Sequence, residues 1–326
     1  MTPSPQPRRF VRHLFLAVAI LLPFTLSAAE RQSLKLLAIG NSFSEDATAF
    51  LPAIAQAGGK DLTLGRASIG GCSLERHARH LAEARAGDEN GRAYHNFIDL
   101  KTGQKRSVTI IEALEATDWD IVTIQQVSHL SFRPETYHPY VDQLIAAIRQ
   151  HAPSAEIVIH EVWAYREDHP FFQKDDGFTP QKMYSQVRDT YRALAAETGF
   201  RLIPVGDAFN LARQTPRWTY TPDPAFDFNH PPANQLPEQR GSLNVGWRWR
   251  KNKDDQPEFG LDAIHSNIAG RYLGASVWYL TLFEADTLPT DYAPDGLAAE
   301  DAADLRRHAL AAVQAELTRP QAVASR

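Results

Sequence analysis

Three side chains of this 326-residue chain have types and spacing that suit nucleophilic chemistry. Ser42 stands in a Gly-Asn-Ser-Phe-Ser segment after an apolar run, and a serine hydroxyl becomes a nucleophile when a base removes its proton. Asp262 and His265 lie three residues apart, so that one turn of backbone lets the carboxylate orient the imidazole. Taken alone, Ser42 also suits a helix cap and His265 a surface position. Together the three suit a nucleophile, its base and an orienting acid.

Two further segments could donate hydrogen bonds to a developing negative charge. Gly70 and Gly71 lie in a Ser-Ile-Gly-Gly-Cys-Ser segment, where paired glycines let backbone N–H groups approach an anion closely. A simple glycine turn is the alternative. Gln125 and Gln126 follow the third predicted strand and bring neutral amide donors, which bind an oxyanion without a charge that would trap the ground state.

Short β-rich apolar runs alternate with amphipathic helical patterns, which predicts a parallel sheet covered by helices on both faces. The predicted strands are Leu34 to Ile39, about Asp61 to Ala67, Trp119 to Ile124, Ile157 to Ile159 and Arg201 to Val205. The predicted helices are Tyr140 to Gln150, Met183 to Glu197, Asn267 to Phe283 and Ala298 to Leu317. Ligands of such sheets bind beyond the carboxyl ends of the strands. The serine, the glycine pair and the glutamine pair all follow predicted strands, so we expect them at one edge of the sheet.

The segment from Asp207 to Gly260 breaks this alternation. It has many prolines and aromatic residues and almost no periodicity, and a loop of this length is typically a functional lid or a disordered segment. Its aromatic residues argue against disorder. Because the segment directly precedes the aspartate and the histidine, we expect a wall or lid beside them, with Trp218, Trp247 and Trp249 as candidate substrate contacts. The alternative is an insertion over the outer edge of the domain that buries Trp247 and Trp249.

Charge and cysteine content argue against several classes of site. The net charge of -5 and the pI of about 6.2 do not suit a surface that binds nucleic acid. The single cysteine, Cys72, cannot form an intramolecular disulfide, and we expect it to be a small buried residue. His160-Glu161 begins like a zinc-protease helix, but Ala164 stands where the second histidine is required, so no metal is expected.

The first 29 residues have the order of a secretory signal peptide. Arg8, Arg9 and Arg12 precede the apolar run Leu14 to Leu26, which small residues follow. We expect cleavage after Ala29, a mature protein in the periplasm or outside the cell, and no stable membrane insertion. An uncleaved anchor is the alternative, but the run is shorter than the roughly 20 residues of a spanning helix and a proline interrupts it.

The quoted segments together resemble the SGNH (GDSL) hydrolase family, in a branch catalogued as a domain of unknown function. The resemblance covers roughly residues 34 to 285 and rests on GNSFSEDA, GGCSLERH, IQQVS, WAY and DAIHSNIAGRYL. It implies a three-layer flavodoxin-like α/β fold with a parallel sheet of about five strands, and no metal or organic cofactor. It also implies Ser42 as the nucleophile, His265 as the base and Asp262 as its orienting acid. The backbone amides of the serine and of the glycine pair would contribute to the oxyanion hole.

The chain departs from the family pattern at two places. Asn41 stands where aspartate is usual, and the Gly-x-Asn-Asp block is missing. Gln125-Gln126-Val127-Ser128 is more similar to the Gln-Gly-Glu-Ser segment of the sialate O-acetylesterase-like branch, so one of its glutamines is expected to be the side-chain donor. Asn41, His77 and Trp163 are further candidates for substrate contact, and packing is the alternative for the last two.

The resemblance implies a serine esterase, and the signal peptide implies its export. Kinship with carbohydrate esterases points to O-acetyl groups on a poly- or oligosaccharide. The aromatic-rich segment suits this substrate because flat rings stack on sugars. Lipid or aryl esters are alternatives, as are an acyltransferase with the same triad and a non-catalytic carbohydrate-binding protein. The expected organisation is a signal peptide (1–29), a hydrolase domain (30–290) with an insertion at 207–260, and a C-terminal helix and tail (291–326).

Overall fold

Five parallel strands form the central sheet of this computed structural model, which describes residues 1–2, 30–174 and 177–319. Their order across the sheet is β2-β1-β5-β6-β7. The strands are β1 (Ser33–Gly40), β2 (Asp61–Ser68), β5 (Ile121–Ile124), β6 (Glu156–His160) and β7 (Arg201–Ile203). Each overlaps one of the predicted runs, so the predicted parallel sheet is confirmed. The predicted signal peptide lies almost wholly outside the described residues.

The apolar character of the strands follows from their position between two layers of helices. All four residues of β5 are buried, as are the last five residues of β1. A parallel strand covered on both faces needs a continuous apolar run and not an alternating pattern. The register pairs Gly40 at the end of β1 with Ser68 at the end of β2, so the loops after these two strands start side by side.

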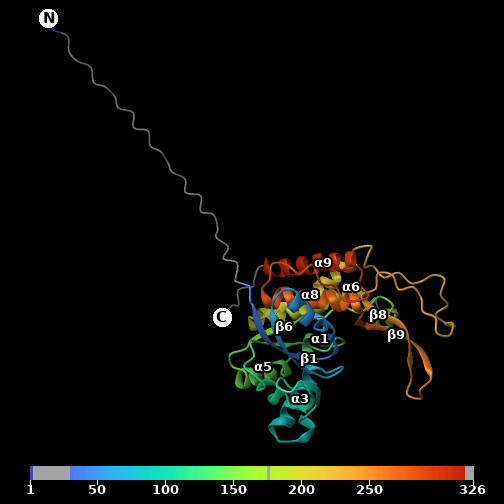
Figure 1. Ribbon diagram of the computed structural model, residues 1–326, viewed down its shortest axis with the longest axis horizontal. Coiled ribbons are helices and arrows are strands. Elements are labelled where there is room, and N and C mark those ends of the chain that lie inside the picture. Colours follow the sequence, from blue (N-terminus) through green and yellow to red (C-terminus); the bar gives the residue numbers. More distant parts are fainter. Residues whose placement is uncertain (3–29, 175–176, 320–326) are drawn as a thin grey trace.

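Helices cover both faces and complete a three-layer arrangement of the flavodoxin type (Figure 1). On one face α8 (Ile268–Phe283) packs against α1 (Ser42–Ala47) and α2 (Leu51–Ala57). On the other face α3 (Leu74–Arg85) packs against α5 (Tyr140–His151). The first loop and helix after β1 therefore lie at the carboxyl edge of the sheet, where ligands of this fold class bind.

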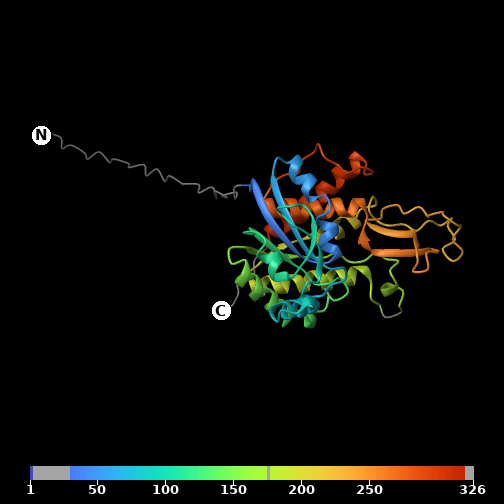
Figure 2. The same ribbon diagram turned by 60° about the horizontal axis from the view of Figure 1, so that its bottom comes forward.

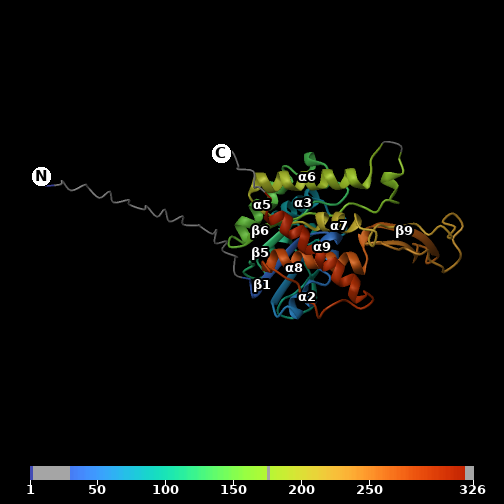
Figure 3. The ribbon, with the colours of Figure 1, turned by 90° about the horizontal axis from the view of Figure 1, so that it is seen from above.

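The remaining helices frame these layers. α9 (Ala299–Leu317) crosses over α8 in Figure 3 and contacts α7 (Val205–Arg213), while α6 (Pro180–Thr198) packs beside β7. A short α4 (Ile110–Leu114) precedes β5, and 3₁₀ turns occur at Glu89–Gly91, Pro134–Thr136 and Pro170–Phe172. The four predicted helices are confirmed to within a few residues at each end, as α5, α6, α8 and α9.

Two antiparallel hairpins in the described part of the chain were not predicted. One consists of β3 (Tyr94–Ile98) and β4 (Lys105–Val108), and the other of β8 (Asn244–Lys251) and β9 (Pro257–Ser266). The β8–β9 hairpin projects from the body of the molecule (Figure 2). It corrects the expectation of a structureless segment from Asp207 to Gly260, because that segment begins inside α7 and ends inside β9.

Within the described residues, no helix is both long and apolar enough to cross a membrane. The most apolar long helix, α8, is buried along almost its whole length as a core element of the domain. Its apolar surface is thus covered by protein: α1, α2, α7 and α9 all pack against it.

Candidate active site

Ser42 is the first residue of α1 and lies directly beyond the carboxyl end of β1. Asn41 caps this helix, since its side-chain oxygen Oδ1 accepts a hydrogen bond from the N–H of Phe43 at 3.1 Å. Ser42 itself is half-buried. The cap holds the serine at a fixed turn between strand and helix, with its own N–H among the amides of the first helical turn that have no partner within the helix.

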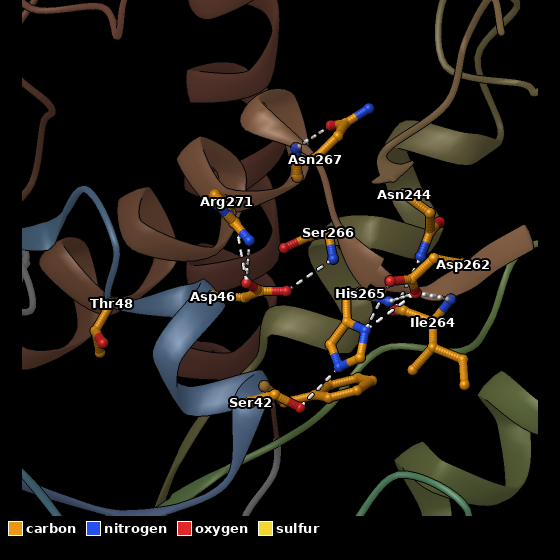
Figure 4. A network of polar contacts seen from close by, with 12 residues as sticks. Ser42, Asp46, Thr48, Asn244, Asp262, Ile264, His265, Ser266, Asn267 and Arg271 are labelled. Carbon is orange, nitrogen blue, oxygen red and sulfur yellow. Dashed lines mark hydrogen bonds and ion pairs between the residues drawn. The ribbon is translucent and has the colours of Figure 1, made fainter. Parts of the chain in front are cut away.

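The structure brings Ser42, His265 and Asp262 together in one chain of contacts (Figure 4). The Oγ atom of Ser42 lies 2.9 Å from Nε2 of His265, and Nδ1 of the same ring lies 3.0 Å from Oδ1 of Asp262. The carboxylate binds the proton on Nδ1, which leaves Nε2 as the acceptor for the serine hydroxyl. The His265 side chain is 38% exposed and that of Asp262 is 11% exposed, so the histidine can be reached from solvent.

An irregularity in β9 turns Asp262 and His265 toward each other. The pairing of β8 with β9 runs Asn244 to Ser266 and then Gly246 to Asp262, so β9 uses two residues more than β8 in this interval. In a regular strand, residues three positions apart point to opposite faces. Bulges of this kind re-aim side chains next to active sites. The aspartate and histidine therefore meet on a strand, where the sequence had suggested a turn.

Contacts from three directions fix this part of β9. The N–H of His265 donates to Oδ1 of Asp262 at 3.0 Å, and Nη2 of Arg248 donates to Oδ2 at 2.9 Å. The indole N–H of Trp163 donates to the carbonyl oxygen of Ile264 at 3.0 Å. Sequence reasoning missed Arg248. The period-two alternation of aromatic and basic residues in Trp-Arg-Trp-Arg, typical of a strand with two different faces, could have indicated it.

The charges of the site shift its pKa values in opposite directions. The hydrogen bond to Asp262 raises the pKa of His265 above its ordinary value, and the charge of Asp46 acts in the same sense, while burial and Arg248 oppose them. Burial raises the pKa of Asp262, but the hydrogen bonds from His265 and the charge of Arg248 outweigh this and hold it well below its ordinary value. Asp262 is therefore ionised, as an acid that stabilises an imidazolium must be.

The loop after β2 lies against the two residues that precede Ser42 and has open backbone amides. It is tied to the end of β1 at two points: the N–H of Ile69 donates to the carbonyl of Gly40 at 3.2 Å, and Nδ2 of Asn41 donates to the carbonyl of Cys72 at 3.0 Å. Between these points, the N–H groups of Gly70 and Gly71 donate to no other described residue. Gly71 has a φ of +64°, which glycine adopts without strain.

The carboxamide of Gln126 forms its hydrogen bonds with residues other than Ser42. Gln126 accepts from the N–H of Leu74 at 3.0 Å, and its Nε2 donates to the carbonyl and hydroxyl oxygens of Thr136 at 3.0 and 3.2 Å. Its expected role as an oxyanion donor does not fit this geometry, because both of its N–H bonds are used to join loops.

Gln125 lies under the turn between β1 and α1 that carries Ser42. Its Nε2 donates to Oδ1 of Asn41 at 2.7 Å, and its Oε1 accepts from the hydroxyl of Ser44 and, at 2.8 Å, from Nδ1 of His160. Asn41 and Gln125 are 0% and 2% exposed. The expected substrate contact of Asn41 is therefore replaced by a role in holding the turn, in which Gln125 orients the residue that caps α1.

His77 and Trp163 are core residues, so the expectation of substrate contact is corrected for both. His77 is 0% exposed, and its ring contacts the hydroxyl of Tyr94 at 2.8 Å and the carbonyl of Gly40 at 3.1 Å. Burial lowers the pKa of His77 to about 3, so it remains neutral. Trp163 is stacked between Phe43 and Phe209, at ring centroid distances of 4.1 and 4.7 Å. It supports the site from beneath.

The three tryptophans of the 207–260 segment do not contact the serine or the histidine. Trp218 is 6% exposed and donates to Asp304 of α9 at 2.8 Å. Trp247 and Trp249 lie on the face of the hairpin opposite to Arg248, because neighbouring strand residues point to opposite faces. Trp247 stacks on Phe259 at 4.9 Å, and both tryptophans are half-buried. These contacts stabilise the hairpin, and the substrate contact expected of the two tryptophans stays a prediction.

Other candidate chemistry is weak in the described part of the chain. Burial raises the pKa of Cys72 to about 12, so this thiol is not a nucleophile at neutral pH. No group of three or more His, Cys, Asp or Glu side chains there is arranged to hold a metal ion. Two cavities of about 300 Å³ each are lined by other residues than Ser42 and His265.

Comparison with known proteins shows a relative of the same fold. A DUF4886 family protein from Bacteroides uniformis is 26% identical, with a TM-score of 0.65, over 89% of this chain and 98% of that one. A protein of Parabacteroides merdae described as a GDSL-like lipase is 12% identical over 79% and 98% of the two chains, with a TM-score of 0.42. A possible lipase from Chitinophaga pinensis is 14% identical over 77% and 98%, with the same TM-score of 0.42.

No curated protein matches the chain. The family model described as a domain of unknown function, DUF4886, matches residues 35–221, which is more than half of the chain and includes Ser42 but ends before the β8–β9 hairpin. The chain therefore belongs to the DUF4886 family.

Proposed function

We propose that this protein is an ester hydrolase of the SGNH type, in which Ser42 is the nucleophile, His265 the general base and Asp262 its orienting acid. The observation that carries the proposal is the unbroken contact chain from Ser42 Oγ to His265 Nε2 at 2.9 Å and from His265 Nδ1 to Asp262 Oδ1 at 3.0 Å. Nucleophile and base within hydrogen-bond reach, with the base oriented by a third group, is the arrangement that activates a serine.

The reaction would proceed in two halves. His265 Nε2 takes the hydroxyl proton as Ser42 Oγ attacks the ester carbonyl carbon, and a tetrahedral oxyanion forms. The imidazolium then returns its proton to the leaving alcohol, and an acyl-enzyme remains on Ser42. A water molecule loses a proton to the same nitrogen and attacks the acyl carbon. Collapse of the second intermediate releases the carboxylic acid and returns the proton to Ser42.

The oxyanion would be bound by backbone N–H groups. The N–H of Ser42 lies in the first turn of α1, and the N–H groups of Gly70 and Gly71 have no other partner among the described residues. Such preorganised donors stabilise the charge that develops in the transition state. Since Gln126 is committed to Thr136, we assign no side-chain donor from it. Gln125 acts indirectly, through its hydrogen bond to Asn41.

The test of this function is hydrolysis of p-nitrophenyl acetate by the chain that begins at residue 30. Ser42→Ala is expected to lower kcat by at least about a thousandfold, because loss of a triad nucleophile removes several powers of ten. Thermal unfolding should be unchanged, since Ser42 is half-buried at the edge of the sheet. A Ser42→Ala variant with near-native rate would refute the proposal.

Ser44→Ala is the matched control for this substitution. Ser44 lies two residues after Ser42 in the same helix, and its hydroxyl is bonded to Gln125 beneath the turn and not to His265. Removal of this hydroxyl should therefore retain substantial activity. If Ser44→Ala lost as much activity as Ser42→Ala, the loss would reflect a disturbed turn and not a missing nucleophile.

We further propose that the substrate is an O-acetyl ester on a poly- or oligosaccharide outside the cytoplasm. An imidazole that is 38% exposed supports access by a large alcohol group. The acetyl group of such a substrate is small, so its binding does not require a deep acyl channel. Released acid should be measured with acetylated polysaccharides, aryl esters of graded chain length and lipid esters. Acetate release from the polysaccharide is the expected result; preference for long chains would select a lipid substrate instead. Transfer of the acyl group to an added sugar would indicate an acyltransferase.

A further inference from the structure

Asp46 connects the two elements that carry Ser42 and His265. It lies in α1, four residues after the serine, and its Oδ2 accepts a hydrogen bond at 2.8 Å from the N–H of Ser266, the residue after the histidine. Its Oδ1 lies 2.9 Å from both Nε and Nη2 of Arg271 in α8. Figure 4 shows this carboxylate between the ends of β9 and α8. Only 7% of the Asp46 side chain is exposed.

The contacts of Asp46 bear directly on the distance between nucleophile and base. Residues four apart on a helix lie on the same face, so Ser42 and Asp46 both face the end of β9. The bond from Ser266 holds the backbone immediately after His265 against α1. A small displacement between catalytic groups has a large effect on rate, because the reacting atoms must be held within hydrogen-bond reach.

Charged groups approach His265 from three elements. Asp262 on β9 contacts its Nδ1, Arg248 on β8 contacts Asp262, and Asp46 on α1 adds a second carboxylate. Both carboxylates raise the pKa of His265, and Arg248 lowers it. Arg271 on α8 is paired with Asp46. The pKa of Asp46 itself is raised above its ordinary value by burial, which the charge of Arg271 and the N–H of Ser266 offset only in part.

We propose that Asp46 is a positioning residue of this site, which fixes Ser42 relative to His265 and adds a second negative charge beside the imidazole. The inference rests on the proposed ester hydrolysis. Asp262 orients the ring through its nitrogen atom, and Asp46 orients the backbone that carries the ring. The site thus uses two carboxylates with different tasks: Asp262 touches the histidine side chain, and Asp46 acts through the residue that follows it.

The test is Asp46→Asn, which keeps the size of the side chain and removes its charge. We expect kcat for p-nitrophenyl acetate to fall by about ten- to a hundredfold, with KM changed by less than about twofold, because positioning is lost and substrate binding is not. The acid limb of the kcat/KM profile reports the imidazole that must be neutral to act as base. Without the charge of Asp46, this limb should move to lower pH by about half a unit.

Asp207→Asn is the matched control. Asp207, in α7, is also buried, at 6% exposure. Its carboxylate binds Arg192 at 2.7 Å and the hydroxyl of Tyr184 at 2.7 Å, and it does not contact the histidine. We expect it to lower the unfolding temperature as Asp46→Asn does and to leave the acid limb in place. If the role of Asp46 were purely structural, the two variants would behave alike. Both would give less folded protein, and neither would shift the acid limb of the kcat/KM profile. This result would overturn the inference.

Asp46→Glu decides the question if Asp46→Asn does not fold. It keeps the negative charge beside Arg271, but its longer side chain displaces the carboxylate from the N–H of Ser266, which it binds at 2.8 Å in the native protein. We expect kcat to fall by about tenfold while the acid limb stays in place, and a kcat equal to that of the wild type would refute the inference. Failure of the proposed function is distinguishable, because it would appear as wild-type protein with no activity, or as activity that survives Ser42→Ala.

Discussion

Arg248 and Asp262 face each other across the β8–β9 hairpin, with Nη2 of the arginine 2.9 Å from Oδ2 of the aspartate. The other carboxylate oxygen, Oδ1, accepts from the N–H of His265 at 3.0 Å and contacts its Nδ1 at 3.0 Å. Each oxygen of Asp262 thus has a partner that fixes it. The hairpin is therefore part of the candidate site, since it supplies both the carboxylate and the cation that orients it.

Arg248→Gln tests this relationship through the pH profile. The hydrogen bond to Asp262 raises the pKa of His265 and Arg248 lowers it, so removal of the arginine should raise it further. The base must be neutral, and the acid limb of kcat/KM should therefore move to higher pH, opposite to the shift expected for Asp46→Asn. We expect a shift of about half a unit and a kcat lower by about three- to tenfold. A limb that moved to lower pH would contradict this account.

The control for this measurement is Arg250→Gln. Arg250 lies on the same face of β8 and pairs with Glu258 at 3.2 Å, but both of these side chains are about half exposed. A solvent-exposed pair contributes little, so this variant should retain both the rate and the position of the acid limb.

Much of the central fold could be predicted because its signal is local. Leu34 to Ile39 and Ile157 to Ile159 are rich in apolar residues, since both faces of these strands are covered, and the turn after β1 follows from the Gly-Asn-Ser segment. The spacing of Asp262 and His265 correctly predicted that their side chains meet, although through a bulged strand in place of a turn.

The remaining features depend on contacts between distant segments. Nothing in the neighbourhood of Asp46 indicates that it binds Ser266, 220 residues later, or that Arg248 reaches Asp262 across a hairpin. Gln125 and Gln126 are adjacent amides with identical local signals, yet they point to different partners. These differences arise from contacts between segments that are distant in the sequence, so local sequence patterns do not reveal them.

Single substitutions should separate the two glutamines. Gln126→Ala removes a carboxamide that binds Leu74 and Thr136, so it leaves buried polar groups without partners and should lower the free energy of unfolding by about 2 kcal/mol. Its rate with p-nitrophenyl acetate should stay within about threefold of wild type, since it binds nothing in the site. Gln125→Ala should lower kcat by about tenfold or more, because Asn41 loses the donor that orients it beneath Ser42.

Urea unfolding and steady-state kinetics of both variants measure these effects. Equal losses of rate would show that the two amides act alike on the turn that carries Ser42. A hundred- to a thousandfold loss for Gln126→Ala alone, without loss of stability, would instead restore it as the oxyanion donor, because that is the usual cost of removing one such group.

The aromatic face of the hairpin leads to the last prediction. Trp247 stacks on Phe259 at 4.9 Å and contacts Phe228 at 5.2 Å, so these rings hold the 221–243 segment against the hairpin on the side away from Asp262. Trp247→Ala should lower the unfolding temperature and reduce kcat/KM for p-nitrophenyl acetate and for an acetylated oligosaccharide by similar factors, because the hairpin that holds Asp262 is loosened in both cases. Trp247→Phe, which keeps a ring for the stack, should retain most of the stability and activity. If Trp247→Ala raised KM for the oligosaccharide alone, the ring would contact substrate, and the aromatic face would have to be part of the binding surface.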